Sequence, residues 1–321
     1  MSGYVSKETS NVIKGFAIIL VFVRHVIPYI IDSGYVPSRI DSGIILIDSI
    51  LNQLIVVPFL FFSGYGVAEQ KKIKGHQYVS TFPRRRILGT WVNFAIAVLV
   101  FYIFSLIVGN TYTVKQIVLS FFAWDSIGNS NWYVFSILLC YLFFYIDSLL
   151  ACKKKHNNYV LLSVLLLLLM ITLSFVKKEW WYNTILVFAF GCFFSSYKIK
   201  IEQLLSSNYW SALIITVFSI CLLYLLYLKG YQLRGITFNM ISCLCCVLLI
   251  MASMKISVRS RLLEWMGGAK LFPMYIYQRL PMFLILSFFP DFVKNHSNLY
   301  ILSSFAITCM ISYCYKHVSL K

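Results

Sequence analysis

Residues 12–31 read Val-Ile-Lys-Gly-Phe-Ala-Ile-Ile-Leu-Val-Phe-Val-Arg-His-Val-Ile-Pro-Tyr-Ile-Ile, an apolar run interrupted by Lys14, Arg24 and His25. A helix of about 20 apolar residues spans a bilayer. Ionisable groups are costly at that depth and mark candidate functional sites. Eleven helical steps turn by about 1100°, roughly 20° past three full turns, which places Lys14 and His25 on one face about 16 Å apart. We therefore expect a transmembrane helix on which both residues line one cavity.

The composition indicates a polytopic membrane protein. The 321 residues are 60% hydrophobic and 12% charged, whereas soluble domains are about a quarter charged. The first apolar run contains charged residues, and no small-residue cleavage site follows it. We therefore expect this segment to be retained rather than removed as a signal peptide. The formal charge of +17 is assigned to loops at the membrane surface, and no nucleic-acid partner is expected.

Hydropathy predicts an all-α bundle of about ten transmembrane helices in a single domain covering residues 1–321. The predicted spans are 12–31, 43–66, 87–108, 131–151, 158–176, 183–197, 210–228, 236–254, 271–289 and 298–315. With the amino terminus in the cytoplasm, 18 basic residues lie inside and 7 outside. The positive-inside rule therefore favours both termini in the cytoplasm.

The segments that join the spans are predicted to be short. The two longest, 67–86 and 109–130, have room for a short helix at most. Thr113–Trp124 has an apolar stripe typical of an interfacial helix. Pro273 and Pro281 fall inside the span 271–289, which could therefore be broken, tilted or re-entrant.

Several residues could carry chemistry, and each also has a structural interpretation. His25 suits a general base, or it could be a packed, hydrogen-bonded histidine. Ser63, before Gly64 at the end of the second span, could contact a ligand or only help helices to pack. Arg84 and Arg86 could bind phosphates, or set topology and touch anionic lipids.

Aromatic residues open the fourth span at the outer surface. Trp132 and Tyr133, with Tyr141 further along, could form the aromatic belt or a platform for a sugar ring. Arg279 lies inside an apolar span and requires a partner or a wet cavity. The triplet Cys243, Cys245 and Cys246 lacks the spacing of a metal site, so no metal is expected.

Five motifs, in this order, resemble those of the acyltransferase-3 family, integral-membrane enzymes that O-acylate glycans of the cell envelope and secreted glycans. They are Lys14 to His25, Phe61 to Tyr65, Arg84-x-Arg86, Asn131-Trp132-Tyr133 to Tyr141, and Met266-Gly267 to Tyr277. Two positions depart from the family pattern. Lys14 stands where arginine is more usual, and Gln278 and Arg279 stand where a histidine often follows the late tyrosine.

The resemblance implies transfer of an acyl group, usually acetyl, from cytoplasmic acetyl-CoA or another acyl-CoA to a hydroxyl of a polysaccharide or lipid-linked sugar. His25 would be the general base or a transient acyl carrier. Lys14, Ser63, Arg84 and Arg86 would bind the donor. Acceptor-binding candidates are Arg24, Trp132, Tyr133, Tyr141 and Arg279. The expected location is the bacterial cytoplasmic membrane, with the lipid bilayer as the surrounding partner.

Two other functions fit the composition. A transporter or exporter of a glycan or an anionic metabolite could line its path with Lys14, Arg24 and Arg279. A glycan polymerase or ligase would use lipid-linked sugars and ignore acyl-CoA. Binding of coenzyme A distinguishes the acyltransferase from both.

Overall fold

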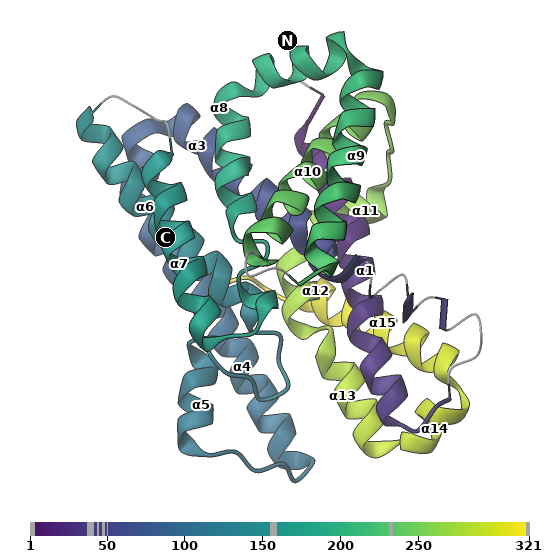
Figure 1. The fold of residues 1–321 in the computed structure, drawn as a ribbon. Coiled ribbons are helices and arrows are strands. Elements are labelled where there is room, and N and C mark those ends of the chain that lie inside the picture. The colour runs from purple at the N-terminus through teal and green to yellow at the C-terminus, as the bar shows by residue number, and fades with distance from the viewer. Residues whose placement is uncertain are drawn as a thin grey trace. The chain divides into compact units, whose positions relative to one another are not determined.

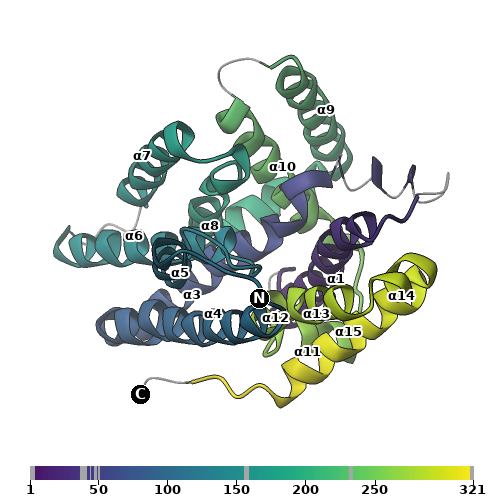
Figure 2. The same ribbon diagram turned by 90° about the horizontal axis from the view of Figure 1, so that it is seen from below.

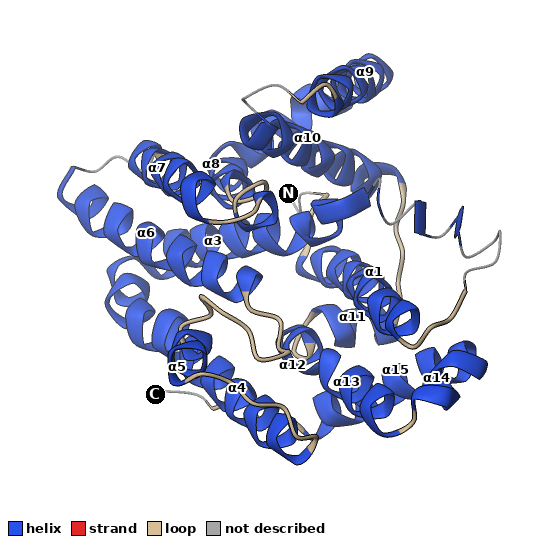
Figure 3. Cartoon of the chain, turned by 60° about the horizontal axis from the view of Figure 1, so that its bottom comes forward, coloured by secondary structure: helices blue, strands red, loops and turns tan. Residues whose placement is uncertain are grey.

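The computed structural model describes residues 4–36, 42–43, 45–46, 49, 51–154, 159–230 and 234–318. Within these ranges the regular elements are helices (Figure 3). Eight helical segments of the described residues are long and apolar enough to cross a membrane, and Val160–Val176 is a shorter apolar helix. The predicted all-α membrane bundle is therefore confirmed.

The helices follow most of the predicted spans. They are α1 (Lys7–Asp32), α3 (Val57–Phe82), α4 (Gly89–Ile107), α5 (Val114–Phe121), α6 (Trp132–Lys154), α7 (Val160–Val176), α8 (Leu186–Ser207), α9 (Tyr209–Leu228), α10 (Arg234–Lys255), α11 (Arg261–Gly267), α12 (Leu271–Tyr277), α13 (Arg279–Phe288), α14 (Pro290–Asn295) and α15 (Ser297–Cys314). Short η segments occupy Asn52–Val56, Pro83–Leu88 and Glu179–Trp181, of which Pro83–Leu88 is a π-helix. The expected interfacial helix is present as α5, and the Thr113 hydroxyl caps it by accepting from the Gln116 amide at 3.2 Å.

The connection predicted over residues 67–86 is wrong. Helix α3 continues to Phe82, and the π-helix then joins it to α4. Hydropathy marks where apolar character ends, but a helix continues through polar residues that favour it. The salt bridge from Lys72 to Glu69, at 2.9 Å, supports this polar stretch, and Gly75, at φ 55°, kinks it. The start of the predicted span 43–66 falls partly outside the described residues.

The chain divides into two compact units. Unit 1 comprises Met1–Val12, Val56–Ile87 and Ser136–Ser260; unit 2 comprises Ile13–Ile55, Leu88–Phe135 and Arg261–Lys321. Both units are assembled from separated stretches of sequence.

Unit 1 is organised around a close contact between α3 and α8. A Cβ at Gly64 would lie 2.0 Å from the Phe188 carbonyl oxygen, and one at Gly191 would lie 2.2 Å from the Phe61 oxygen. Small residues permit such close backbone approach between membrane helices. Helix α9 runs beside α10 in the same unit (Figure 1) and exposes most of its apolar side chains, as expected for a helix that faces lipid.

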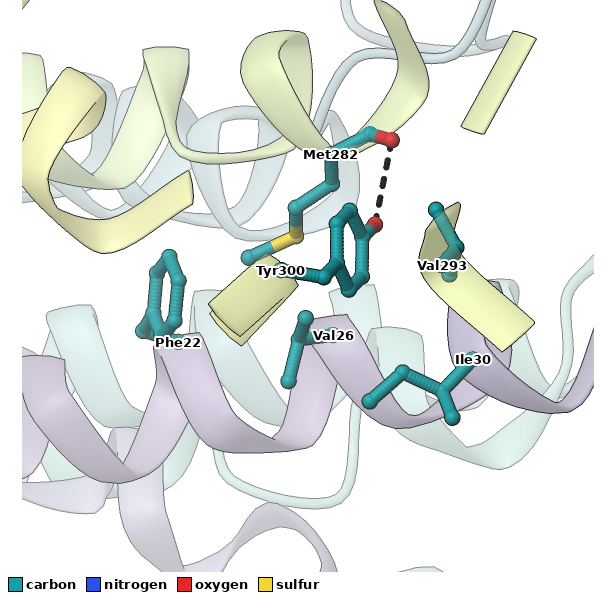
Figure 4. Close-up of a cluster of buried hydrophobic side chains, with 6 residues drawn as sticks. All are labelled: Phe22, Val26, Ile30, Met282, Val293 and Tyr300. Carbon is teal, nitrogen blue, oxygen red and sulfur yellow. Dashed lines mark hydrogen bonds between the residues drawn. The ribbon is translucent and has the colours of Figure 1, made fainter. Parts of the chain in front are cut away.

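Unit 2 has an apolar core where α1 meets the helices near the C-terminus. In Figure 2, α1 lies beside α13, α14 and α15. The core consists of Phe22, Val26 and Ile30 from α1 with Met282, Val293 and Tyr300 (Figure 4). The three α1 residues are spaced four apart and so form one stripe. The Tyr300 hydroxyl is satisfied within the core, because it donates to the Met282 carbonyl oxygen at 3.0 Å.

The segment after α15 is fixed to α4 by one buried amide. The Asn93 Nδ2 group donates to the Val318 carbonyl at 3.0 Å, and Asn93 Oδ1 accepts from the Val318 amide at 3.0 Å. The Tyr315 hydroxyl also donates to Asn93 Oδ1. The Asn93 side chain therefore forms hydrogen bonds with both the N–H and the C=O of Val318, as a neighbouring backbone would in regular secondary structure.

The expected irregularity of the ninth span is confined to one residue, Gln278, whose backbone angles of φ −56° and ψ −33° are still helical. Helices α12 and α13 meet at Gln278, which separates them. Proline at 281 has no N–H to donate to the carbonyl four residues earlier, at Tyr277. Tyr275 and Arg279 lie on either side of Gln278, four positions apart.

Candidate active site

His25 lies on an unbroken helix, as the sequence predicted. Helix α1 runs from Lys7 to Asp32 with Pro28 inside it. Lys14 and His25 both belong to unit 2 and are eleven residues apart on one continuous helix. Beside Lys14, Gly15 brings α1 against the backbone of α11, since a Cβ there would lie 2.1 Å from the Leu263 carbonyl oxygen.

The imidazole of His25 faces a pair of tyrosines from distant parts of the sequence. Its ring centroid lies 6.5 Å from that of Tyr275 in α12. The Tyr275 ring is in turn 5.0 Å from the ring of Tyr133, near the start of α6. Tyr133 therefore belongs to the cluster of rings around His25.

Several polar atoms in this cluster are buried and have no hydrogen-bond partner. They are His25 Nδ1, Ser130 Oγ, the Tyr275 hydroxyl, Gln278 Oε1 and Arg279 Nε. The hydroxyls of Ser130 and Tyr275 are neighbours, but their geometry does not make a good hydrogen bond. Buried polar groups are nearly always paired, so an unpaired set is a departure that calls for an explanation such as a bound ligand.

Two arginines accompany His25. Arg24 precedes it in α1, and Arg279 lies across from it at the start of α13; both are close enough to interact electrostatically with the imidazole. The Arg279 guanidinium is 5.6 Å from the centroid of the Tyr29 ring, a cation–π contact. The site thus contains a titratable base, phenol and alcohol hydroxyls, and positive charge.

The loop before α6 holds its part of the site through its own hydrogen bonds. Asn129 Oδ1 accepts from the Ile127 amide at 3.1 Å, and the Ser126 hydroxyl donates to the Asn129 carbonyl at 2.7 Å. Asn131 Nδ2 donates to the Asp125 carbonyl at 2.9 Å. These bonds fix the backbone on either side of Ser130 and lead directly into Trp132 and Tyr133.

The other predicted residues lie in unit 1. Ser63 is in α3, Arg84 and Arg86 are in the π-helix, and Tyr141 is in α6. The Arg86 guanidinium lies near the hydroxyls of Tyr78 and Tyr141. Tyr141 therefore accompanies the arginine motif rather than Trp132 and Tyr133, with which the sequence grouped it.

The arginine motif, Arg84 and Arg86, differs from two lysines of the same unit in its polar partners. Lys72 is paired with Glu69, and Lys198 donates to the Tyr65 hydroxyl at 3.0 Å. No carboxylate of the described residues forms an ion pair with Arg84 or Arg86, and both residues are exposed. π-helical segments are often found at functional sites.

Sequence reasoning missed Ser130, Tyr275 and Gln278 as site residues. Tyr275 precedes Arg279 by four positions, which was a usable signal, because residues four apart lie on one helix face. Nothing in the local pattern marks Ser130, a serine in the loop before α6. Among the described residues, no three histidine, cysteine or acidic side chains are grouped so as to hold a metal ion.

The comparison with protein families agrees with the resemblance seen in the motifs. The acyltransferase-3 family model, described as an acyltransferase domain, matches residues 8–317. No curated protein and no solved structure matches the chain. The match covers both structural units and nearly the whole sequence. The chain therefore belongs to the acyltransferase-3 family and is a membrane acyltransferase.

Proposed function

We propose that this protein moves an acyl group, most simply acetyl, from cytoplasmic acyl-CoA to a hydroxyl of a glycan of the bacterial cell envelope or of an exported polysaccharide. The observation that carries the proposal is the unpaired, buried Nδ1 of His25 beside the Tyr275 and Ser130 hydroxyls. A ring nitrogen without a partner is available to accept a proton from a substrate hydroxyl. Family membership favours this function over export or glycan polymerisation.

In the proposed reaction, His25 first accepts a proton and later donates it. The acceptor hydroxyl gives its proton to Nδ1 as its oxygen attacks the thioester carbonyl. The tetrahedral intermediate then collapses, the C–S bond breaks, and the departing thiolate takes the proton from the imidazolium. The Tyr275 hydroxyl is placed to donate to an oxygen on which negative charge develops.

The donor's phosphates are assigned to the arginine motif of unit 1. Arg84 and Arg86 are exposed cations with no carboxylate partner among the described residues, and guanidinium groups bind phosphate bidentately. Ser63 and Lys14 remain donor-binding candidates. The close contact of Gly64 with α8 gives the small residues around Ser63 a packing role in addition.

The catalytic assignment is tested with protein purified into nanodiscs, labelled acetyl-CoA and an envelope glycan. His25→Ala should lower the transfer rate by about 100-fold or more, the usual contribution of a general base. The matched control is His76→Ala, because His76 is exposed on α3. A His25→Ala protein that transfers acetyl at the wild-type rate would refute the assignment.

The donor site is tested separately, by calorimetric binding of coenzyme A. Arg84→Ala and Arg86→Ala should each weaken binding by about 10-fold or more, as expected for loss of a charge-assisted hydrogen bond. Arg85→Ala is the control, since it removes the same charge from the middle of the motif. Equal losses in the three variants would indicate general attraction rather than a defined phosphate site.

A further inference from the structure

Arg279 follows Gln278 in the ninth span, and its charge lies next to the proposed reaction centre. It is the first residue of α13, four positions after Tyr275. Its guanidinium contacts the face of the Tyr29 ring and is close to His25. Any ligand whose hydroxyl reaches His25 therefore lies beside this cation.

The charge of Arg279 is not balanced within the described part of the chain. No described carboxylate forms an ion pair with it, and its Nε is buried without a hydrogen-bond partner. A cation inside a membrane protein is costly without a partner. An anion supplied by a ligand would remove this cost.

The uncharged groups around Arg279 suit a carbohydrate. Gln278 Oε1 is an acceptor without a donor, and the Ser130 and Tyr275 hydroxyls can donate or accept. The ring of Tyr133 against Tyr275 adds an aromatic surface. Polar groups of both kinds beside aromatic rings match the alternating hydroxyls and apolar faces of a sugar.

We propose that the acceptor is an acidic glycan, whose carboxylate or phosphate binds Arg279 and thereby places a neighbouring hydroxyl at His25. This rests on the proposed function and adds the substrate class to it. Arg279 is then a specificity residue: it binds the acceptor in the ground state and does not take part in proton transfer. An arginine suits this role because its planar group binds a carboxylate or phosphate through two hydrogen bonds.

The first experiment compares two soluble acceptors that differ only in charge: an oligosaccharide containing glucuronic acid, and the same oligosaccharide with its carboxylates reduced to alcohols. Wild-type protein should show a KM for acetyl transfer about 10- to 100-fold lower for the acidic acceptor. Arg279→Gln should abolish this ratio, and Arg279→Lys should retain part of it. Arg234→Gln, which removes a guanidinium paired with Glu179 in unit 1, should keep the full ratio.

A second pair of probes identifies the source of the anion. A neutral oligosaccharide is compared with its 6-phosphate and with the same sugar on an isoprenyl diphosphate. A preference that depends on Arg279 and appears only with the phosphorylated probes assigns the anion to phosphate. A preference for the glucuronic acid probe assigns it to a ring carboxylate.

Binding of the same probes, measured by thermal shift without acetyl-CoA, separates this proposal from the proposed function. If binding of the acidic probes depends on Arg279 but no acyl group is transferred, the proposal of an acidic ligand is supported and the transferase mechanism is refuted. The proposal of an acidic acceptor would be overturned if wild type and Arg279→Gln showed the same preference for the charged over the neutral probe, in acyl transfer or in binding. A wild-type preference for the neutral probes would overturn it as well. A kcat loss equal on both acceptors, with the ratio unchanged, would show that Arg279 acts on the reaction itself.

Discussion

Two glycines in one helix, Gly64 and Gly66, should respond oppositely to substitution by alanine. A Cβ at Gly64 would lie 2.0 Å from the Phe188 carbonyl oxygen, whereas a Cβ at Gly66 would meet nothing within 4 Å. Real Cβ contacts are essentially never shorter than 3.0 Å, so Gly64→Ala forces α3 and α8 apart by at least about 1.0 Å at this point. The obstacle is backbone, which cannot rotate away as a flexible side chain would.

The magnitude follows from the two opposing effects of the added methyl group. Overpacking of a well-packed interior costs about 1–3 kcal/mol, and alanine is better than glycine in a helix by about 0.5–1 kcal/mol. Gly64→Ala should therefore lower the free energy of unfolding by up to about 2.5 kcal/mol, and Gly66→Ala should raise it by about 0.5–1 kcal/mol. The two variants should differ by about 1–3 kcal/mol, the overpacking cost, because the gain in helix propensity is common to both.

The assay is reversible unfolding in mixed micelles, followed by tryptophan fluorescence, with coenzyme A binding measured on the folded protein. Gly64→Ala should unfold at a lower denaturant fraction than wild type, and Gly66→Ala at the same or a higher one. Equal stability of the two variants would refute the inference that Gly64 is required for close helix packing. If Gly64→Ala kept its stability and lost only coenzyme A binding, the glycine would be needed for a ligand instead.

Three further changes test other parts of the structure. Gly15→Ala should destabilise unit 2 by up to about 2.5 kcal/mol after the same gain in helix propensity, because its Cβ would lie 2.1 Å from the Leu263 oxygen; a more stable variant would contradict this contact. Asn93→Ala should release the segment after α15, seen as faster proteolysis near the C-terminus, and wild-type protection would show that the amide is not required. Tyr300→Phe should cost about 1–2 kcal/mol of unfolding free energy, since the hydroxyl bonds a buried carbonyl; Tyr313→Phe, at a residue 74% exposed, is its control and should be neutral.

Hydropathy located nearly all of the helices but not all of their ends. The bilayer requires about 20 apolar residues for each span, and runs of this length can be found directly in the sequence. Beyond the apolar run, the helix can continue wherever its residues favour it. For that reason α3 reaches Phe82 and α8 reaches Ser207, where hydropathy placed the ends near residues 66 and 197.

The site was predicted in part. His25, Tyr133 and Arg279 were identified as candidates, because ionisable and aromatic residues within apolar runs stand out against their surroundings. Tyr275 was seen only as part of a motif. Ser130 gave no signal, since its importance comes from a loop fold built by Ser126, Asn129 and Asn131.

The sequence by itself determined that this is a helical membrane protein and, through its ordered motifs, the family to which it belongs. Both are local properties, because each apolar run and each motif is contained in a short stretch. Only the tertiary structure decided that His25, Tyr133 and Tyr275 meet, that Tyr141 lies near Arg86 instead, and that the Arg279 charge has no ion-pair partner in the described chain. These facts depend on how distant helices pack, and packing is set by contacts such as glycine against backbone that no single stretch of sequence contains.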